Sequence, residues 1–409
     1  MARVSSTTAD PAAEAAALLR RVGFATLFLV VPAAALVTRR GLVVLIPIGV
    51  FLVAIAAAID GAQRPVAATA QAIARSPAGI AAGVALLWCV LSLIWTPFPA
   101  QASERLLNIA ATIAMALAGY LALPDRMRSA NLYLIPVGVI LAAAVGCAVA
   151  RFGVPVQRSA EVVAQNLDRG LTVLALLAWP AAAWLNSRGR PVEAFAVAAL
   201  VGLATLLGPQ ASPPVAFAVG ALAFGLTALA GRRGVAAVAW AGAGLLALAP
   251  LIPYLARPVA GLFLETGHPV LRALRIWRSV VGGEPERLVT GHGFETALRG
   301  RLEGLLPINA PNTILLELWY ELGVVGALAA AVALFAAVVA SGRNSPSVVP
   351  GMTAAFATAY AFACLGVGTA QMWWFTALAL VVLVFVAIER GQFRTTRPKA
   401  RFSRAANDR

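Results

Sequence analysis

The sequence predicts an all-α polytopic membrane protein of about 12 transmembrane helices, with a large outer loop that carries short helices. Hydrophobic residues make up 61% of the 409 residues and charged residues only 12%, which lies outside the usual composition of soluble domains. The apolar runs are long enough to cross a bilayer as helices. They are too long and too uniform for barrel strands, so helices that satisfy their own backbone hydrogen bonds are expected.

Polar, basic or proline-containing turns separate the expected spans. We place the spans at residues 22–38, 41–59, 78–95, 107–123, 132–150, 171–185, 192–207, 215–230, 235–255, 318–340, 352–370 and 373–388. The third span ends at Trp95, followed by Pro97 and Pro99, because tryptophan suits the membrane interface and proline stops a helix. The predicted organisation is a tail (1–21), nine spans (22–255), the loop (256–311), three spans (312–389) and a basic tail (390–409).

The positive-inside rule places both termini in the cytoplasm. With that orientation every short cytoplasmic turn is basic, as at Arg126 and Arg128 or at Arg188 and Arg190, and Arg39-Arg40 is the one clear exception. The arginines of the two long outer loops, 151–169 and 256–311, run against the rule. Orientation therefore does not explain them, and they become functional candidates.

The net charge of +15 does not indicate a nucleic-acid partner in so apolar a chain. Membrane lipids are the expected partners, because anionic headgroups attract arginine and lysine at membrane surfaces. Cys89, Cys147 and Cys364 lie inside apolar runs without motif spacing. We interpret them as small core residues rather than as a disulfide or metal site. The sequence predicts no metal site and no cofactor.

Arginines are dense in the outer loop and suit an anionic substrate. Arg272, Arg275 and Arg278 recur at intervals of three, so the first two share a helix face with the third close to it. Guanidinium groups donate paired hydrogen bonds to phosphate and keep their charge. Arg299 lies in the same loop, and Arg169 is expected directly before a span, near the interface. Snorkelling to lipid headgroups is the alternative reading of any single arginine.

Catalytic motifs of well-known enzymes are absent: there is no HExxH, Walker loop or CxxC motif. His292 stands between two glycines, as in a tight turn, and is either catalytic or a solvent-facing turn residue. Glu317 and Glu321 are four residues apart at the start of the tenth span. Carboxylates at membrane depth are costly and are usually functional or paired.

Four stretches of the sequence together resemble the O-antigen ligase/polymerase superfamily, on its ligase branch. They are residues 92–102 (SLIWTPFPAQA), Leu167-Asp168-Arg169-Gly170 through Trp179-Pro180, Ile276-Trp277 followed by Gly291-His292-Gly293, and residues 307–312 (PINAPN) followed by Glu321-Leu322-Gly323 and Gly326. The resemblance covers residues 92–327 in order.

The resemblance implies a GT-C-like, metal-independent inverting glycosyltransferase of the bacterial inner membrane. Such enzymes move a glycan from undecaprenyl diphosphate to an acceptor, which is the lipid A core for ligases. Arginines hold the diphosphate; Arg169 takes the first such position and Arg272 or Arg275 the second. Arg278, Arg299 and Glu321 are expected to contribute to substrate binding.

One position departs from the family. The loop usually closes with His-Asn, and that histidine is thought to help activate the acceptor, whereas this chain has Pro311-Asn312. Asn312 and His292 remain catalytic candidates. Three alternatives stay open: a polymerase for a surface polysaccharide, a family member that binds lipid-linked glycan without transferring it, and an unrelated transporter.

Overall fold

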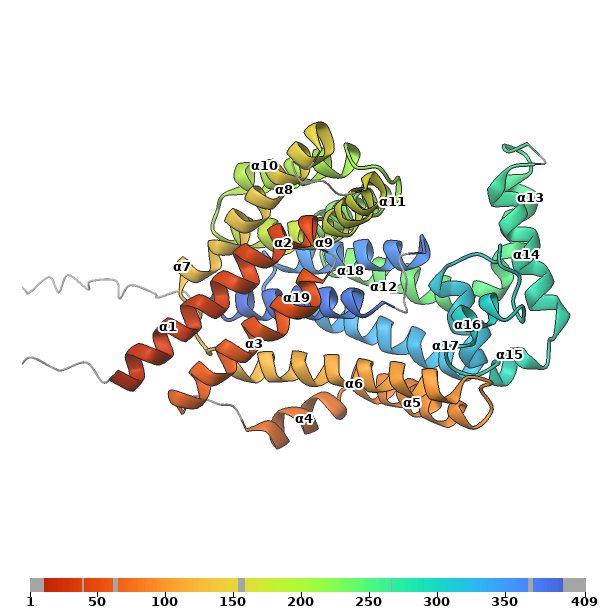
Figure 1. Ribbon diagram of the computed structural model, residues 1–409, viewed down its shortest axis with the longest axis horizontal. Helices are drawn as coiled ribbons and strands as arrows, with labels where there is room; N and C mark the ends of the chain where they lie inside the picture. Colours follow the sequence, from red (N-terminus) through yellow and green to blue (C-terminus); the bar gives the residue numbers. More distant parts are fainter. Residues whose placement is uncertain are drawn as a thin grey trace, which may run out of the picture.

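The computed structural model describes residues 11–38, 40–61, 65–153, 159–265, 267–366 and 371–392, and all regular secondary structure in these ranges is helical. Within them, nine helices are long and apolar enough to cross a membrane, or ten if one bent pair counts as a single span. Two shorter apolar helices accompany them. The fold is therefore that of an all-helical, multi-pass membrane protein, with most helices running along the long axis of the molecule (Figure 1).

Thirteen helices form the main bundle in the described part of the chain. They are α1 (Pro11–Ala25), α2 (Val31–Val37), α3 (Gly41–Ile59), α5 (Pro77–Leu91), α6 (Pro99–Ala122), α8 (Leu134–Phe152), α9 (Ala160–Ser187), α10 (Pro191–Leu206), α11 (Ser212–Ala230), α12 (Arg232–Ala247), α17 (Ile314–Ser341), α18 (Val349–Cys364) and α19 (Met372–Glu389). The other helices are α4 (Val66–Ala74), α7 (Ser129–Leu132), α13 (Ile252–Ala260), α14 (Pro269–Gly283), α15 (Arg287–Thr290) and α16 (Thr296–Leu302).

Each predicted span overlaps an apolar helix, but several boundaries differ. Helix α1 covers Pro11–Ala25, so residues 11–21, expected as part of a tail, are helical. The alanines in this stretch favour a helix. Helix α9 begins at Ala160, eleven residues before the expected start, and Arg169 therefore lies inside the helix. The expected tail residues 1–10 and 393–409, with Arg39, lie outside the described residues.

The ninth predicted span, residues 235–255, is broken in the structure. Helix α12 ends at Ala247, and α13 continues at an angle of 64° to it. Pro250 lies in the short 3-10 turn between the two helices, and Pro253 lies in the first turn of α13. A proline cannot donate its backbone hydrogen bond and its ring crowds the preceding turn, so a bend at this place is expected.

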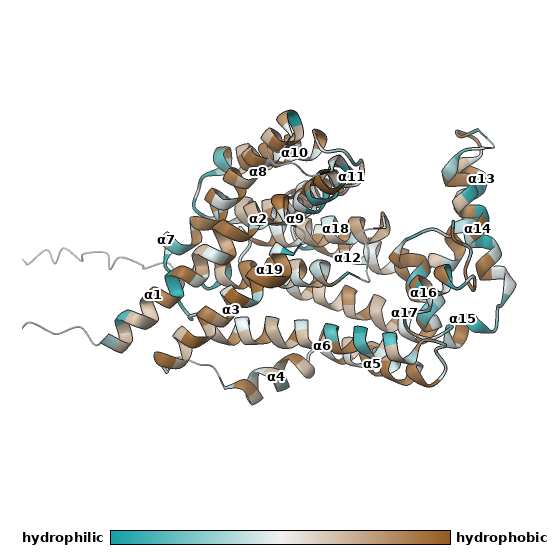
Figure 2. Cartoon of the chain, in the orientation of Figure 1, coloured by the Kyte–Doolittle hydropathy of each residue, from teal (hydrophilic) through white to brown (hydrophobic). Residues whose placement is uncertain are grey.

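The two ends of the bundle differ. At one end, here called the terminal end, α1 begins and α19 stops; at the other, the loop end, α13 to α16 lie (Figure 1). Hydrophilic residues gather in the α13–α16 region and at α7, while the bundle between them is largely hydrophobic (Figure 2).

Helix α9 is the central helix of the bundle. In its apolar window 89% of the residues are buried inside the protein. Its Trp184 is completely buried, and the indole of Trp179 donates a 2.7 Å hydrogen bond to the hydroxyl of Thr358 on α18. This hydrogen bond satisfies a polar group that would otherwise be buried without a partner.

Candidate functional site

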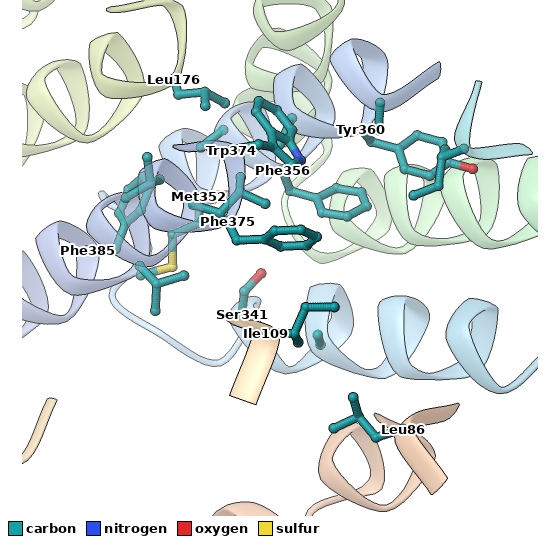
Figure 3. Close-up of a pocket in the computed structure, with 18 of the residues that line it drawn as sticks. Leu86, Ile109, Leu176, Ser341, Met352, Phe356, Tyr360, Trp374, Phe375 and Phe385 are labelled. Carbon is teal, nitrogen blue, oxygen red and sulfur yellow. The ribbon is translucent and has the colours of Figure 1, made fainter. Parts of the chain in front are cut away.

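A large apolar cavity lies inside the bundle, enclosed mainly by α5, α6, α17, α18 and α19. Its volume is about 1120 Å³, slightly above the roughly 300–1,000 Å³ of most small-molecule sites. In Figure 3, Trp374, Phe356 and Tyr360 line one side, and Leu86, Ile109 and Ser341 line the other. The lining is predominantly aliphatic and aromatic, so the cavity suits a hydrocarbon chain.

Charged residues line the cavity near both ends of the bundle. Arg105, Glu317 and Glu321 contribute to its wall at the loop end. Glu389 and Arg390 contribute at the terminal end, where the Glu389 carboxylate accepts hydrogen bonds from the backbone N–H and the hydroxyl of Ser345, at 2.9 and 2.8 Å. The cavity therefore runs between two polar ends through an apolar middle.

Three arginines and three glutamates form a charged cluster at the loop end: Arg105, Arg299, Arg301, Glu295, Glu317 and Glu321. Arg105 Nη1 lies 2.6 Å from Glu295 Oε2 and 3.8 Å from Glu321 Oε1. Arg301 pairs with Glu317 at 3.3 Å, and Arg299 approaches Glu295 at 3.8 Å. The side chains of Glu295 and Glu321 are each only 6% exposed. Burial at this level is tolerated because each carboxylate has a cationic partner.

The backbone of the outer loop packs directly against α17, at the point where this helix is interrupted. Gly323 has φ +61° and ψ −161°, which interrupts the helix. The carbonyl oxygens of Tyr320 and Glu321, just before the break, accept hydrogen bonds from the backbone N–H groups of His292 and Gly293, at 2.8 and 2.9 Å. The loop thus satisfies carbonyl groups beside the kink, and it brings Glu295 to Arg105.

Glycines make this close approach possible. Gly291 and Gly293 have φ of +74° and +101°, conformations that glycine adopts without the steric cost of a Cβ atom. A Cβ atom on Gly323 would lie 2.5 Å from the carbonyl oxygen of Val289. Glu295 itself has φ +72°, which is uncommon for a residue with a side chain and marks local strain near candidate functional groups.

His292 is engaged by its surroundings rather than directed into the cavity. Its ring stacks on Tyr320, with centroids 3.9 Å apart, and its Nδ1 lies 3.0 Å from the Tyr320 carbonyl oxygen. Its Nε2 lies 3.3 Å from a carboxylate oxygen of Glu284. His292 does not contribute to the cavity wall. The expected tight turn is present, and it presents backbone N–H groups to α17.

Arg169 does not line the cavity itself, but it lies beside Trp373 of α19 and on the helix face of the cavity residue Leu176. Its guanidinium carbon is 5.8 Å from the ring centre of Trp373, the neighbour of the cavity residue Trp374. Leu176, seven residues further along α9, lines the cavity. Seven residues correspond to almost two helical turns, so Arg169 shares a face with Leu176 about 10 Å nearer the start of the helix.

The three loop arginines at intervals of three lie away from the cavity. Arg272, Arg275 and Arg278 are exposed on α14, whose opposite face buries Leu271, Leu274, Trp277 and Val281. Arg278 stacks over Tyr254 of α13 at 5.0 Å. Within the described residues, the guanidinium groups of Arg272 and Arg275 make no hydrogen bond or ion pair. None of the three lines the cavity.

Asn312 is exposed, and its side-chain N–H group donates a 3.1 Å hydrogen bond to the carbonyl oxygen of Gly366. It therefore connects the start of α17 to the end of α18. The structure thus brings Arg299 and Glu321 into the charged cluster, and places Arg169, His292, Asn312 and the α14 arginines outside it.

Sequence reasoning did not select Arg105, Glu295, Arg301 or Glu317 as site residues. The available signal was their position: charged residues at the edges of apolar runs are costly and need partners. Which arginine pairs with which glutamate depends on the loop conformation, which the sequence pattern does not specify. Among the described residues, no group of three or more His, Cys, Asp or Glu side chains has a metal-binding arrangement.

Comparison of the sequence with protein-family models gives no match, and comparison with curated protein sequences gives no significant match.

Proposed function

We propose that this protein is a membrane glycosyltransferase of the O-antigen ligase type. In this proposal it moves a glycan from an undecaprenyl diphosphate carrier to a lipid A-core acceptor at the outer face of the bacterial inner membrane. Both termini lie in the cytoplasm, and the loop end faces the periplasm. Helix α1 starts and α19 ends at the same end of the bundle (Figure 1), which agrees with this orientation.

The observation that carries the proposal is the apolar cavity with charged residues at the loop end. A polyprenyl chain is a long hydrocarbon attached to an anionic head. The cavity of about 1120 Å³ is suited to part of the chain, with the diphosphate and glycan held at the loop end.

Arg169 is the residue we assign to the diphosphate. It lies beside Trp373, on the face of α9 that also carries the cavity residue Leu176. In the reaction, an acceptor hydroxyl attacks the anomeric carbon and the bond from that carbon to the diphosphate breaks. The electron pair stays on the diphosphate oxygen, and a fixed guanidinium stabilises the charge that develops there.

A deletion strain tests the proposal, with its surface glycans separated on a gel and its lipid-linked precursors measured in parallel. A ligase predicts loss of long glycan from the lipid A core and accumulation of carrier-linked glycan. Complementation with the wild-type gene restores the profile, whereas the Arg169→Ala variant does not. Shortening of the glycan to single repeats would instead assign the polymerase activity.

A protein that binds lipid-linked glycan without transferring it is the second candidate. Two observations favour it: Pro311 stands where the family has histidine, and the ring of His292 is engaged by Tyr320 and Glu284. An unchanged glycan profile, in a strain from which other ligases have also been deleted, would favour this candidate over the transferase.

A further inference from the structure

We infer that Glu317 is the general base of the reaction, the group that takes the proton from the acceptor hydroxyl. The inference rests on the proposed function and names the residue that does the work expected of the missing histidine. Three observations support it. One face of α17 lines the cavity, the three glutamates of the cluster have different partners, and the formal charges of the cluster cancel.

The first turns of α17 present one face to the cavity. Ile314, Glu317, Leu318 and Glu321 all line its wall, and their spacing of three and four residues is that of a single helix face. Glu317 is one turn closer to the start of α17 than Glu321. It therefore lies where an acceptor arriving from the loop side would meet a glycan held at the cavity mouth.

The three glutamates of the cluster are engaged differently. Glu295 is bound to Arg105 at 2.6 Å and does not line the cavity. Glu321 lines the cavity, but one of its oxygens accepts a 3.0 Å hydrogen bond from the backbone N–H of Ala297. That bond fixes the loop to α17, so the role of Glu321 is to hold the loop in place.

Glu317 is positioned from outside the helix. Arg301 of α16 lies 3.3 Å from Glu317 Oε1 and also donates a 3.0 Å hydrogen bond to the carbonyl oxygen of Pro311. The arginine is thereby fixed to the loop backbone and holds the carboxylate at the cavity wall. The side chain of Glu317 is 13% exposed, twice the exposure of Glu321. A base must be held within hydrogen-bond reach of its substrate, and this arrangement provides such positioning.

The charge balance of the cluster disfavours diphosphate binding there. Three arginines face three glutamates, so the formal charges cancel. A diphosphate would gain little from such a cluster, because its arginines already contact glutamates. The diphosphate is therefore assigned to Arg169 and the proton to Glu317.

The proposed step balances as follows. The acceptor O–H proton moves to a Glu317 oxygen as the acceptor oxygen forms its bond to the anomeric carbon. The bond between that carbon and the diphosphate oxygen breaks on the opposite side, and the electron pair leaves with the diphosphate. The configuration at the anomeric carbon is inverted. The protonated Glu317 then releases its proton to water.

Glycan transfer by the purified full-length protein tests the inference, with a polyprenyl diphosphate-linked glycan as donor and a lipid A-core acceptor. We expect Glu317→Gln to lower kcat by about 10²–10⁴-fold, the usual contribution of a general base, with the KM for the donor unchanged. Glu303→Gln is the matched control, because Glu303 is exposed in the same loop. That control is expected to retain wild-type kcat.

A second variant separates chemistry from folding. Glu317→Ala removes the carboxylate, and we expect added formate to restore part of its kcat, which a purely structural loss would not allow. Donor binding by the same samples reports whether the variants are folded. If Glu317→Gln is misfolded, Glu317→Asp takes its place, because it keeps a carboxylate beside Arg301. We expect this variant to bind the donor and to have a kcat at least tenfold below that of the wild type.

Two outcomes would overturn the inference. In the first, the wild-type protein transfers glycan and the Glu317→Gln or Glu317→Asp variant has the same kcat. Glu317 would then have no part in the mechanism, while the proposed function would stand. Absence of transfer by the wild-type protein, while it still binds the donor, would contradict the proposed function and the inference together.

Discussion

Arg105 and Glu295 are 190 positions apart in the sequence, and their side chains meet at 2.6 Å in the structure. The contact joins α6 of the bundle to the outer loop just after the Gly291-His292-Gly293 turn. The Arg105 guanidinium also lies 4.7 Å from the ring centre of Phe294. This pair, with the backbone hydrogen bonds from the turn to α17, holds the loop over the mouth of the cavity.

Removing one member of this pair is predicted to destabilise the protein. Arg105→Gln leaves the Glu295 carboxylate buried without its main partner, and loss of one member of a buried pair typically costs about 3–5 kcal/mol. Thermal unfolding in detergent measures the effect. Arg190→Gln is the control, because its ion pair with Glu193 is half exposed and such pairs contribute less than about 1 kcal/mol. Equal unfolding temperatures for the two variants would contradict the structural role of Arg105.

The backbone contact between the turn and α17 predicts a second effect on stability. Gly323→Ala adds a Cβ atom 2.5 Å from the Val289 carbonyl oxygen at a residue with φ +61°. With its ψ of −161°, this residue lies in a backbone region essentially restricted to glycine, which costs on the order of 1–3 kcal/mol for a residue with a Cβ atom, and the overlap adds to it. We therefore expect a lower unfolding temperature and reduced transfer.

Gly244→Ala is the matched control for this substitution. Gly244 lies within α12, and a Cβ atom there meets nothing within 4 Å. In a helix interior, alanine is favoured over glycine by roughly 0.5–1 kcal/mol. The control is expected to unfold at the same or a higher temperature. An unfolding temperature of Gly323→Ala equal to that of the control would contradict the close contact of the loop backbone with α17 at Gly323.

The assignment of the diphosphate predicts loss of activity in Arg169→Ala. Removing one fixed donor from a developing negative charge commonly lowers kcat by about 10²–10³-fold. Arg169→Lys keeps the charge but not the planar pair of donors, and an intermediate kcat is expected. Transfer by the purified variants checks both values. Arg169→Ala at wild-type kcat would remove this residue from the site.

The cavity predicts that a bulky side chain inside it competes with the donor lipid. Ala359→Phe on α18 places a ring in the open space of the cavity, so the protein is expected to stay folded while the KM for a long-chain donor rises. A donor with a short chain is expected to be affected less. Ala221→Phe, on the exposed face of α11, is the control. Equal KM values for the two variants would show that the lipid chain lies elsewhere.

The exposed arginines of α14 predict an effect on binding alone. Combined substitution of Arg272 and Arg275 by glutamine removes two charges from the surface, where stability changes are usually within about 0.5 kcal/mol. If these arginines attract an anionic substrate, KM rises at low salt while kcat is unchanged, and the difference shrinks at high salt. A matched fall in kcat would instead give them a part in the chemical step.

The sequence by itself determined the fold class and the approximate position of every long helix. Apolar runs of membrane length leave the backbone no alternative to helix in lipid, and the predicted span 41–59 coincides with α3. Several helix boundaries differ from the predicted ones. Residues 11–21 are helical, α9 already begins at Ala160, and the ninth predicted span is bent between α12 and α13. The two glycines that flank His292 were predicted as turn residues, but their contact with the break at Gly323 was not predicted.

Only the tertiary structure decided which charged residues meet. Arginines at regular spacing in the loop were the strongest sequence signal, yet Arg272 and Arg275 lie exposed on α14. Arg105 and Arg301, without such a pattern, are held among the glutamates at the cavity mouth. Periodicity describes one helix at a time, whereas the partners of a buried charge come from distant segments brought together by packing. For the same reason the cavity itself, a space shared by five helices, has no counterpart in the sequence pattern.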